Sequence, residues 1–319
     1  MPGFLLRRLL GMLGVLFGMS VLIFAVVHIL PGNVAYAILG EYATPGAVAA
    51  LEAKLGLHDP LPLQYWHWLD GMLHGDLGMS LVMTRPAAPL ILEALGRSAI
   101  LAGSAFVLVA VGGIALGIHT ATHQGRMSDR VLTLGQFVFI AVPDFFWSIL
   151  GILIFASWLH LLPATGYVPL GEAGLLSWLS HLILPVLVLC VGLLAHVSRL
   201  TRSSMIEVLH SRYVLAARAK GLTERRVLWR HALPNALLPT ITVLAIDFGL
   251  LIGGIVVVET VFAYPGLGRL LVFAIEHHDL PLLQAGMMVV TAIYALANLA
   301  ADLSYAALNP RIRVGGAAA

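Results

Sequence analysis

The sequence predicts an all-α membrane protein that crosses the bilayer several times. Of its 319 residues, 60% are hydrophobic and 11% are charged, a composition far too apolar for a soluble domain. Its long apolar runs are each near the ~20 residues that a helix needs to cross the hydrocarbon layer, and none alternates as a strand does. We therefore expect six transmembrane helices, which are Leu9–Leu30, Ser98–His119, Val131–Leu159, Ser180–Val197, Leu237–Val258 and Leu282–Ala306.

The distribution of Lys and Arg predicts the orientation of these helices. The sequence has 18 basic residues, and the four that fall outside the predicted cytoplasmic segments are Lys54, Arg85, Arg97 and Arg269. All the others lie in four segments that share one side of the membrane, namely 1–8, 120–130, 198–236 and 307–319. The positive-inside rule therefore predicts that both termini are cytoplasmic.

The N-terminal third is expected to differ from the rest of the chain. Residues 1–97 are predicted to hold the first transmembrane helix and a long external loop, and residues 98–319 a five-helix core with the cytoplasmic loop 198–236. The basic N-terminus would also suit a signal peptide, but the following apolar run continues for about 20 residues, as a spanning helix does. In the external loop, Thr44–Pro45 marks a helix start. A second small amphipathic helix should pack through a stripe of Trp66, Leu69, Met72 and Leu73.

Polar residues inside the predicted spans are candidates for the lining of a transport path. Pro143 interrupts the third span and is followed by Asp144, while Asp247 lies in the fifth span before a glycine-rich stretch, which would allow close helix approach. Acids at this depth usually face a bundle interior or a water-filled path. Alternatively, each caps a kink or pairs with a neighbour, and this structural role suits Asp302 near the cytoplasmic end. The path candidates are Asp144, Asp247 and Asn298.

One long polar and basic stretch interrupts the apolar sequence on the cytoplasmic side, Tyr213–Asn235, YVLAARAKGLTERRVLWRHALPN. Four of its residues fall three and four apart, so they share one narrow helix face suited to docking on another protein: Tyr213, Ala216, Ala217 and Lys220. Gly221 can turn the chain at the end of this helix because glycine tolerates a positive φ. Pro234 sits where a following helix could begin.

This spacing resembles the EAA loop of the membrane subunits of binding-protein-dependent ABC importers. The family pattern is EAA, three residues, Gly, nine residues, Ile, one residue and Leu-Pro. The matching residues are Ala216, Ala217, Gly221, Leu233 and Pro234, whereas Leu215 replaces the Glu and His231 replaces the Ile. The run ARAKGL…RHALPNALLP, the turn ETVFAYPGLG and the tail NLAADLSYAALNPRIR resemble the oligopeptide, dipeptide and nickel branch. The resemblance therefore extends over almost the whole chain.

The resemblance implies the fold of a type I ABC importer permease in the bacterial inner membrane. It also implies partners: a second, related permease chain, two cytoplasmic ATPase subunits and an external substrate-binding protein, with no role for nucleic acid. The chain has no GxxxxGK[ST] run, so ATP and Mg²⁺ are expected on the partners and no cofactor or enzymatic activity in this chain. The expected substrates are di- or oligopeptides, and nickel, a nickel chelate or glutathione remain alternatives.

Other classes of function have weaker support in the sequence. The external histidines, including His277 and His278, would suit nickel, but neighbouring histidines diverge on a helix and no HExxH or Cys/His cluster is present. An intramembrane hydrolase needs a nucleophile and a base, for which the nearest candidates are Ser148, Ser180 and His181 without a GxSxG motif. A channel needs a pore-lining ring or filter, and no such pattern is visible.

Overall fold

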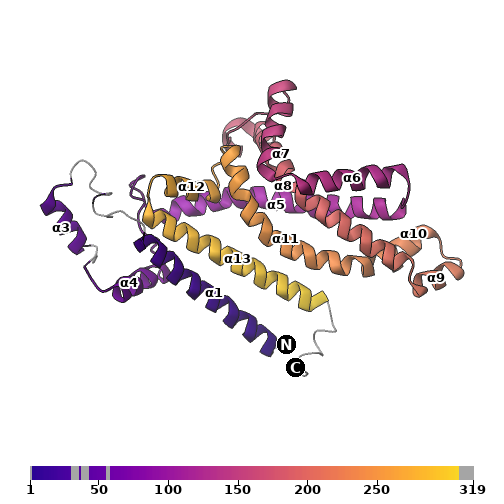
Figure 1. Cartoon of the computed structure of the whole chain (residues 1–319), viewed down its shortest axis with the longest axis horizontal. Helices are drawn as coiled ribbons and strands as arrows, with labels where there is room; N and C mark the ends of the chain where they lie inside the picture. Colours follow the sequence, from indigo (N-terminus) through magenta and orange to yellow (C-terminus); the bar gives the residue numbers. More distant parts are fainter. Residues whose placement is uncertain (1, 30–35, 37–42, 55–57, 309–319) are drawn as a thin grey trace. The chain divides into compact units, whose positions relative to one another are not determined.

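A computed structural model of the chain is shown in Figure 1, and it describes residues 2–29, 36, 43–54 and 58–308. Within these ranges the chain is helical, and its β-structure is limited to one isolated bridge between Met79 and Pro86. Five helices are long and apolar enough to cross a membrane, and a bent helix pair brings the number to 6 when it is taken as one span. The predicted all-α, polytopic architecture is therefore confirmed. The last residues of the family-like tail, Asn309 to Arg313, lie outside the described ranges.

The helices form two compact units. One unit contains Ser98–Tyr264 and the C-terminal part from Ala297, and the other contains Pro2–Arg97 together with Pro265–Leu296. This differs from the sequence-based division, which placed residues 265–296 with the five-helix core. The reason is an apolar cluster that joins the start of α5 (Ala87–Thr122) to α12 (Leu267–Glu276) and to the first turns of α13 (Leu280–Leu308).

In the N-terminal unit, α4 (Leu61–Leu73) packs against α1 (Pro2–Ile29). The Tyr65 hydroxyl lies 2.7 Å from that of Ser20, and the Tyr65 ring lies 5.4 Å from that of Phe24. The predicted stripe is therefore wrong in part: Trp66 and Leu73 are exposed, while Tyr65 and Trp68 join Leu69 and Met72 on the inner side. α3 (Pro45–Lys54) begins where predicted, with the hydroxyl of Thr44 accepting the N–H of Ala47 at 3.3 Å.

The same unit is tied together by one buried carboxylate. Asp279, immediately before α13, accepts the Ser80 hydroxyl at 2.5 Å and the N–H of Leu81 at 3.1 Å. Asp279 and Ser80 are both almost inaccessible to solvent. Because a buried carboxylate is expensive unless its oxygens are bonded, these contacts fix the external loop to the segment between α12 and α13.

The C-terminal unit is built on three long helices, α5, α8 (Leu170–Leu209) and α11 (Leu233–Val261). Gly113 and Gly117 of α5 let it approach α8 closely, since a Cβ at Gly113 would lie 2.8 Å from Val197 Cγ1. The glycines after Asp247 were also predicted to allow close approach. A Cβ at Gly253 would meet nothing within 4 Å, whereas one at Gly254 would lie 3.4 Å from Oδ2 of Asp144, so of these two glycines Gly254 lies at a close contact.

The third span is broken rather than merely kinked. α6 (Met127–Ala141) and α7 (Asp144–Gly151), which continues as the π-helical η2 (Ile152–Trp158), meet at an angle of 108°. Val142 and Pro143 are both extended, because proline cannot donate to the preceding turn and disfavours a helical residue before it. The predicted interruption is confirmed, and it places Asp144 in the first turn of a new helix.

Candidate functional site

The predicted docking stretch forms a compact helical hairpin between α8 and α11, made of α9 (Arg212–Ala219), α10 (Glu224–Arg226) and the π-helical η3 (Val227–Ala232). In Figure 1 it lies beyond the ends of α8 and α11. α9 ends at Lys220, and Gly221 follows with φ +80°, a conformation that glycine adopts without steric cost. The predicted turn at Gly221 is confirmed. The predicted helix start at Leu233–Pro234 is wrong, because the backbone is already helical from Glu224 and at Leu233 only changes from the π-helical η3 to the α-helical α11.

The predicted docking face of α9 is divided between the interior and the surface. Val214 is fully buried and Ala217 is 7% exposed, and both pack in an apolar cluster with the ends of α5, α8 and α11. Tyr213, Ala216 and Lys220 are exposed. Ala217 was predicted on the docking face, but the inward-facing stripe is centred near Val214, and at 100° per residue Ala217 falls on its edge. Its small side chain therefore serves packing.

A charged strap that the sequence did not reveal fastens the hairpin. The Arg218 guanidinium donates to both carboxylate oxygens of Glu224, at 2.8 and 3.2 Å, and to the carbonyl of Leu209 at 3.2 Å. These residues are not at helical spacing, so only the turn at Gly221 brings them together. One side chain thus connects the end of α8, α9 and the start of α10.

A second set of hydrogen bonds links α9 to the start of α11. Asn235 donates to the Tyr213 hydroxyl at 3.1 Å and to the carbonyl of His231 at 3.0 Å. His231, which replaces the Ile of the family pattern, is partly buried and contributes through its backbone. The exposed Pro234 lies two residues after the end of the π-helical η3, where the helix changes to the α form. Tyr213 therefore has a structural role as well as an exposed ring.

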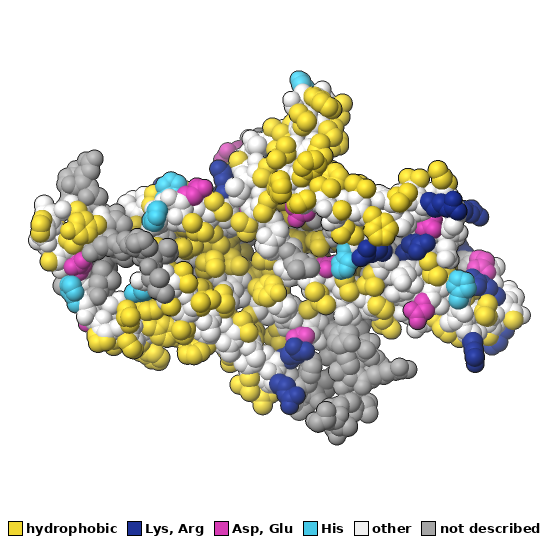
Figure 2. Space-filling model, in the orientation of Figure 1, with side chains coloured by type: hydrophobic (Ala, Val, Ile, Leu, Met, Phe, Trp, Pro, Cys, Tyr) yellow, Lys and Arg dark blue, Asp and Glu magenta, His cyan; other side chains and the backbone are white. Residues whose placement is uncertain are grey.

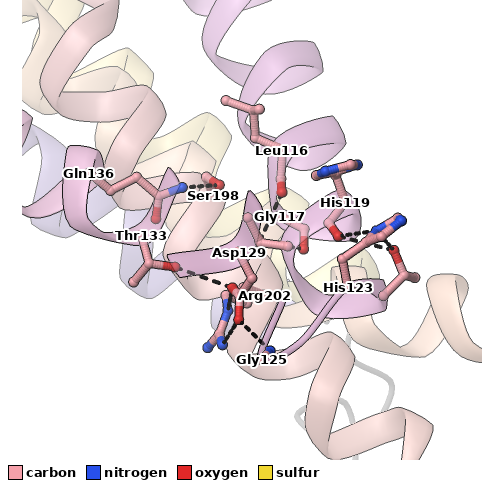
Figure 3. A network of polar contacts seen from close by, with 12 residues as sticks. Leu116, Gly117, His119, His123, Gly125, Asp129, Thr133, Gln136, Ser198 and Arg202 are labelled. Carbon is pink, nitrogen blue, oxygen red and sulfur yellow. Dashed lines mark hydrogen bonds and ion pairs between the residues drawn. The ribbon is translucent and has the colours of Figure 1, made fainter. Parts of the chain in front are cut away.

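At the base of the hairpin, a polar network joins the start of α6 to the last turns of α8 (Figure 3). Arg202 of α8 donates to both oxygens of Asp129 in α6 at 2.7 and 2.9 Å, and the Gly125 N–H donates to the same carboxylate at 2.9 Å. Two turns further along α6, Gln136 donates to Ser198 at 2.8 Å. Because the Asp129 side chain is 5% exposed, this bidentate pair is a strong constraint on how α6 meets α8.

The outer surface of the hairpin is basic. In Figure 2, Lys and Arg side chains gather at the end of the molecule that carries α9 and α10, while the flanks of the helices are largely hydrophobic. A shallow groove there is lined by Thr223, Arg225, Arg226, Trp229 and Arg230. A rigid hairpin with an exposed basic and aromatic surface can bind a protein and pass on its movement.

Two of the three path candidates lie where α7, α8 and α11 pack together, Asp144 on α7 and Asp247 on α11. Asp247 is 2% exposed, and its oxygens lie 3.1 and 3.2 Å from Nδ1 of His196. Asp144 is partly buried, and a Cβ at Gly254 of α11 would lie 3.4 Å from its Oδ2. Asn298 is exposed on α13. His196 was not among the predicted residues, because its pairing with an acid 51 residues away depends on how α8 and α11 pack.

Comparison with known proteins identifies the family. Residues 113–314 match the profile described as binding-protein-dependent transport system inner membrane component, and residues 1–91 match the corresponding N-terminal profile. The chain belongs to this family. It is 37% identical to a probable peptide ABC transporter permease protein of Sinorhizobium fredii, over 97% of this chain and 99% of that one. It is 39% identical to the glutathione transport system permease protein GsiC of Escherichia coli, over 98% of this chain and 99% of that one.

A solved structure shows the same fold. A chain of the MetNI methionine ABC transporter in an inward-facing conformation aligns with a TM-score of 0.55 at 16% identity, over 69% of this chain and 96% of that chain. The protein is thus a multi-pass inner-membrane permease subunit of an ABC importer, which works with ATPase and substrate-binding partners.

The features that suggested other functions have local explanations in this permease. The Ser148 hydroxyl donates to the carbonyl of Asp144, and the hydroxyl of Ser180 and Nδ1 of His181 both bond to the carbonyl of Ser177. These are contacts within a single helix, not a nucleophile and base on facing helices. Among the described residues, no group of three His, Cys, Asp or Glu side chains is arranged to hold a metal ion.

Proposed function

We propose that this permease forms part of the translocation path for di- or oligopeptides. The observation that carries the proposal is the full-length similarity to a peptide permease and to a permease for glutathione, which is itself a small peptide. The place where α7, α8 and α11 pack together supports it, because Asp144 of α7 offers a carboxylate and His196 of α8 offers an imidazole to a ligand with charges of both signs.

The hairpin of α9, α10 and η3 is proposed to receive the ATP-driven movement. A paired, related permease chain would complete the path, and two ATPase subunits would hold ATP and Mg²⁺, leaving this chain without a cofactor. When the ATPases close on ATP, they would pull on the hairpin surface near Tyr213, Ala216 and Lys220. The strap at Arg218 and the buried Ala217 would pass that movement to α8 and α11, which would rock between inward- and outward-facing states.

The test is ATP-dependent uptake by the complete importer in proteoliposomes, supplied with its binding protein. We expect labelled di- and tripeptides to accumulate only with ATP, and to accumulate less when an excess of unlabelled peptide competes. Uptake of glutathione alone, or of Ni²⁺ alone, would reject the general peptide assignment and select one of the alternatives. If the purified permease brought no ATPase with it, the proposed role of the hairpin would be wrong.

A further inference from the structure

We propose that Asp144 and the His196–Asp247 pair form a subsite that recognises a zwitterion, binding the ammonium of a short peptide at Asp144 and its carboxylate at His196. This inference rests on the proposed peptide import. It adds which atoms of the substrate this chain recognises and which of its residues do so.

Asp144 is a carboxylate without a bonding partner for its side chain among the residues that the structure describes. It sits in the first turn of α7, directly after the break at Pro143, and its oxygens face two glycines. A Cβ at Gly254 would lie 3.4 Å from Oδ2 and one at Gly192 would lie 3.9 Å from Oδ1. An acid inside a membrane is normally paired or functional, and here the two glycines let the carboxylate lie close to the backbones of α8 and α11 without bonding to a side chain there. A positively charged group of a substrate is the complementary partner.

His196 presents the opposite chemistry on the same face of α8. It follows Gly192 by one helical turn, and its Nδ1 donates to Asp247, which is an acceptor when ionised. The Asp247 side chain is 2% exposed, whereas that of His196 is 43% exposed. With Nδ1 held by the acid, Nε2 is the nitrogen left for a ligand, and the protonated ring donates from it. The buried Asp247 would balance a charge on the ring, so a protonated His196 is not left as an unpaired cation when no substrate is bound.

The spacing of the two groups fits a short peptide. Gly192 and His196 are four residues apart, so the level of Asp144 and the level of His196 differ by about 6 Å along the axis of α8. On α11, Gly254 and Asp247 lie seven residues apart, which is about 10 Å along that axis, in the antiparallel register that these contacts require. An extended dipeptide spans at most about 7 Å. This length falls between the two separations, so a dipeptide matches the scale of the subsite.

A metal ion is a poorer fit to the same residues. Asp144, His196 and Asp247 are all of ligand type, yet no such group in the described part of the chain is close enough to hold one ion. Asp247 is also nearly inaccessible, and both of its oxygens face His196. Separated charges of opposite sign favour a zwitterion.

The test uses the purified complete importer without its binding protein, so that only the membrane subunits select the ligand. Labelled dialanine is bound first and then displaced by one of three unlabelled competitors, which are dialanine, N-acetyl-dialanine and dialanine amide. We expect the unmodified importer to prefer dialanine about tenfold over each blocked peptide, the effect of one charge-assisted hydrogen bond. Asp144→Asn should remove the discrimination against the acetylated peptide and keep that against the amide, and His196→Gln should do the reverse.

His160→Gln, at an exposed histidine that is not part of the proposed subsite, is the matched control and should keep both preferences. The inference is overturned if either substitution weakens all three probes equally, or if both preferences survive both substitutions. It is also overturned, without any variant, if the unmodified importer binds the blocked peptides as well as dialanine. Vesicle uptake with the binding protein separates the two hypotheses: dialanine uptake without these preferences refutes only the subsite, and absence of peptide uptake refutes the proposed function.

Discussion

Two regions use polar residues in opposite ways: the cytoplasmic hairpin, and the seam between α7, α8 and α11 that holds Asp144, His196 and Asp247. In the hairpin and its base, the charged groups that tie one element to another are paired within the chain, as in Arg218–Glu224 and Arg202–Asp129. In the seam, Asp144 has no side-chain partner among the described residues, and His196 is paired on one nitrogen only. A part that transmits force benefits from internal bonds that keep it rigid, whereas a part that meets a passing substrate must keep some bonds free. Substitutions should therefore affect stability in one region and transport in the other.

The largest effect on stability is expected at the base of the hairpin. Arg202→Met leaves the buried Asp129 unpaired, and breaking a buried pair in this way costs about 3–5 kcal/mol. Thermal unfolding of the detergent-purified protein should therefore shift to a lower temperature. Arg199→Met, at an exposed arginine three residues earlier, is the control and should change little. If both variants unfolded at the same temperature, the network would contribute no rigidity.

The next largest loss of stability is expected from a substitution of Ala217. Ala217→Asp places a carboxylate in the apolar cluster under α9, which should cost several kcal/mol and uncouple uptake from ATP hydrolysis while membrane insertion persists. Ala219→Asp, two residues away and exposed, should leave the unfolding temperature nearly unchanged. Equal destabilisation by the two substitutions would show that α9 does not pack as described.

Because α5 packs closely on α8, we expect a smaller loss of stability that depends on which glycine of α5 is replaced. Gly117→Ala introduces a Cβ that would lie 2.7 Å from the Ser198 carbonyl oxygen, and overpacking of this kind costs about 1–3 kcal/mol. Gly103→Ala, in the same helix but with nothing within 4 Å, should instead be neutral or stabilising by up to about 1 kcal/mol. Opposite signs in a denaturation assay confirm the contact, and equal signs contradict it.

The sharpest contrast with the hairpin comes from the seam. Asp144→Asn removes an unpaired charge from the membrane interior, so the folded protein should be as stable as before or slightly more so, while peptide uptake falls. The measurement pairs unfolding temperature with uptake in proteoliposomes. A marked loss of stability would mean that Asp144 has a structural partner, and the seam would then resemble the hairpin.

The smallest effect is expected at the exposed strap. Glu224→Gln weakens the pair with Arg218, and because exposed ion pairs contribute about 0.2–1 kcal/mol, the unfolding temperature should hardly change. Transport per ATP hydrolysed should nevertheless fall, since α9 and α10 would move less as one body. Unchanged coupling would show that the apolar cluster alone makes the hairpin rigid.

The sequence by itself determined the membrane class, the spans, the break at Pro143 and the turn at Gly221. These features depend on local chemistry, namely the length of apolar runs, the missing N–H of proline and the conformational freedom of glycine. Only the tertiary structure decided that Ala217 faces inward and that Arg218 reaches Glu224. It also paired His196 with Asp247 and joined residues 265–296 to the N-terminal unit. Such contacts depend on which helix faces meet, and a helical repeat fixes the faces of one helix but not the neighbour that each face will find.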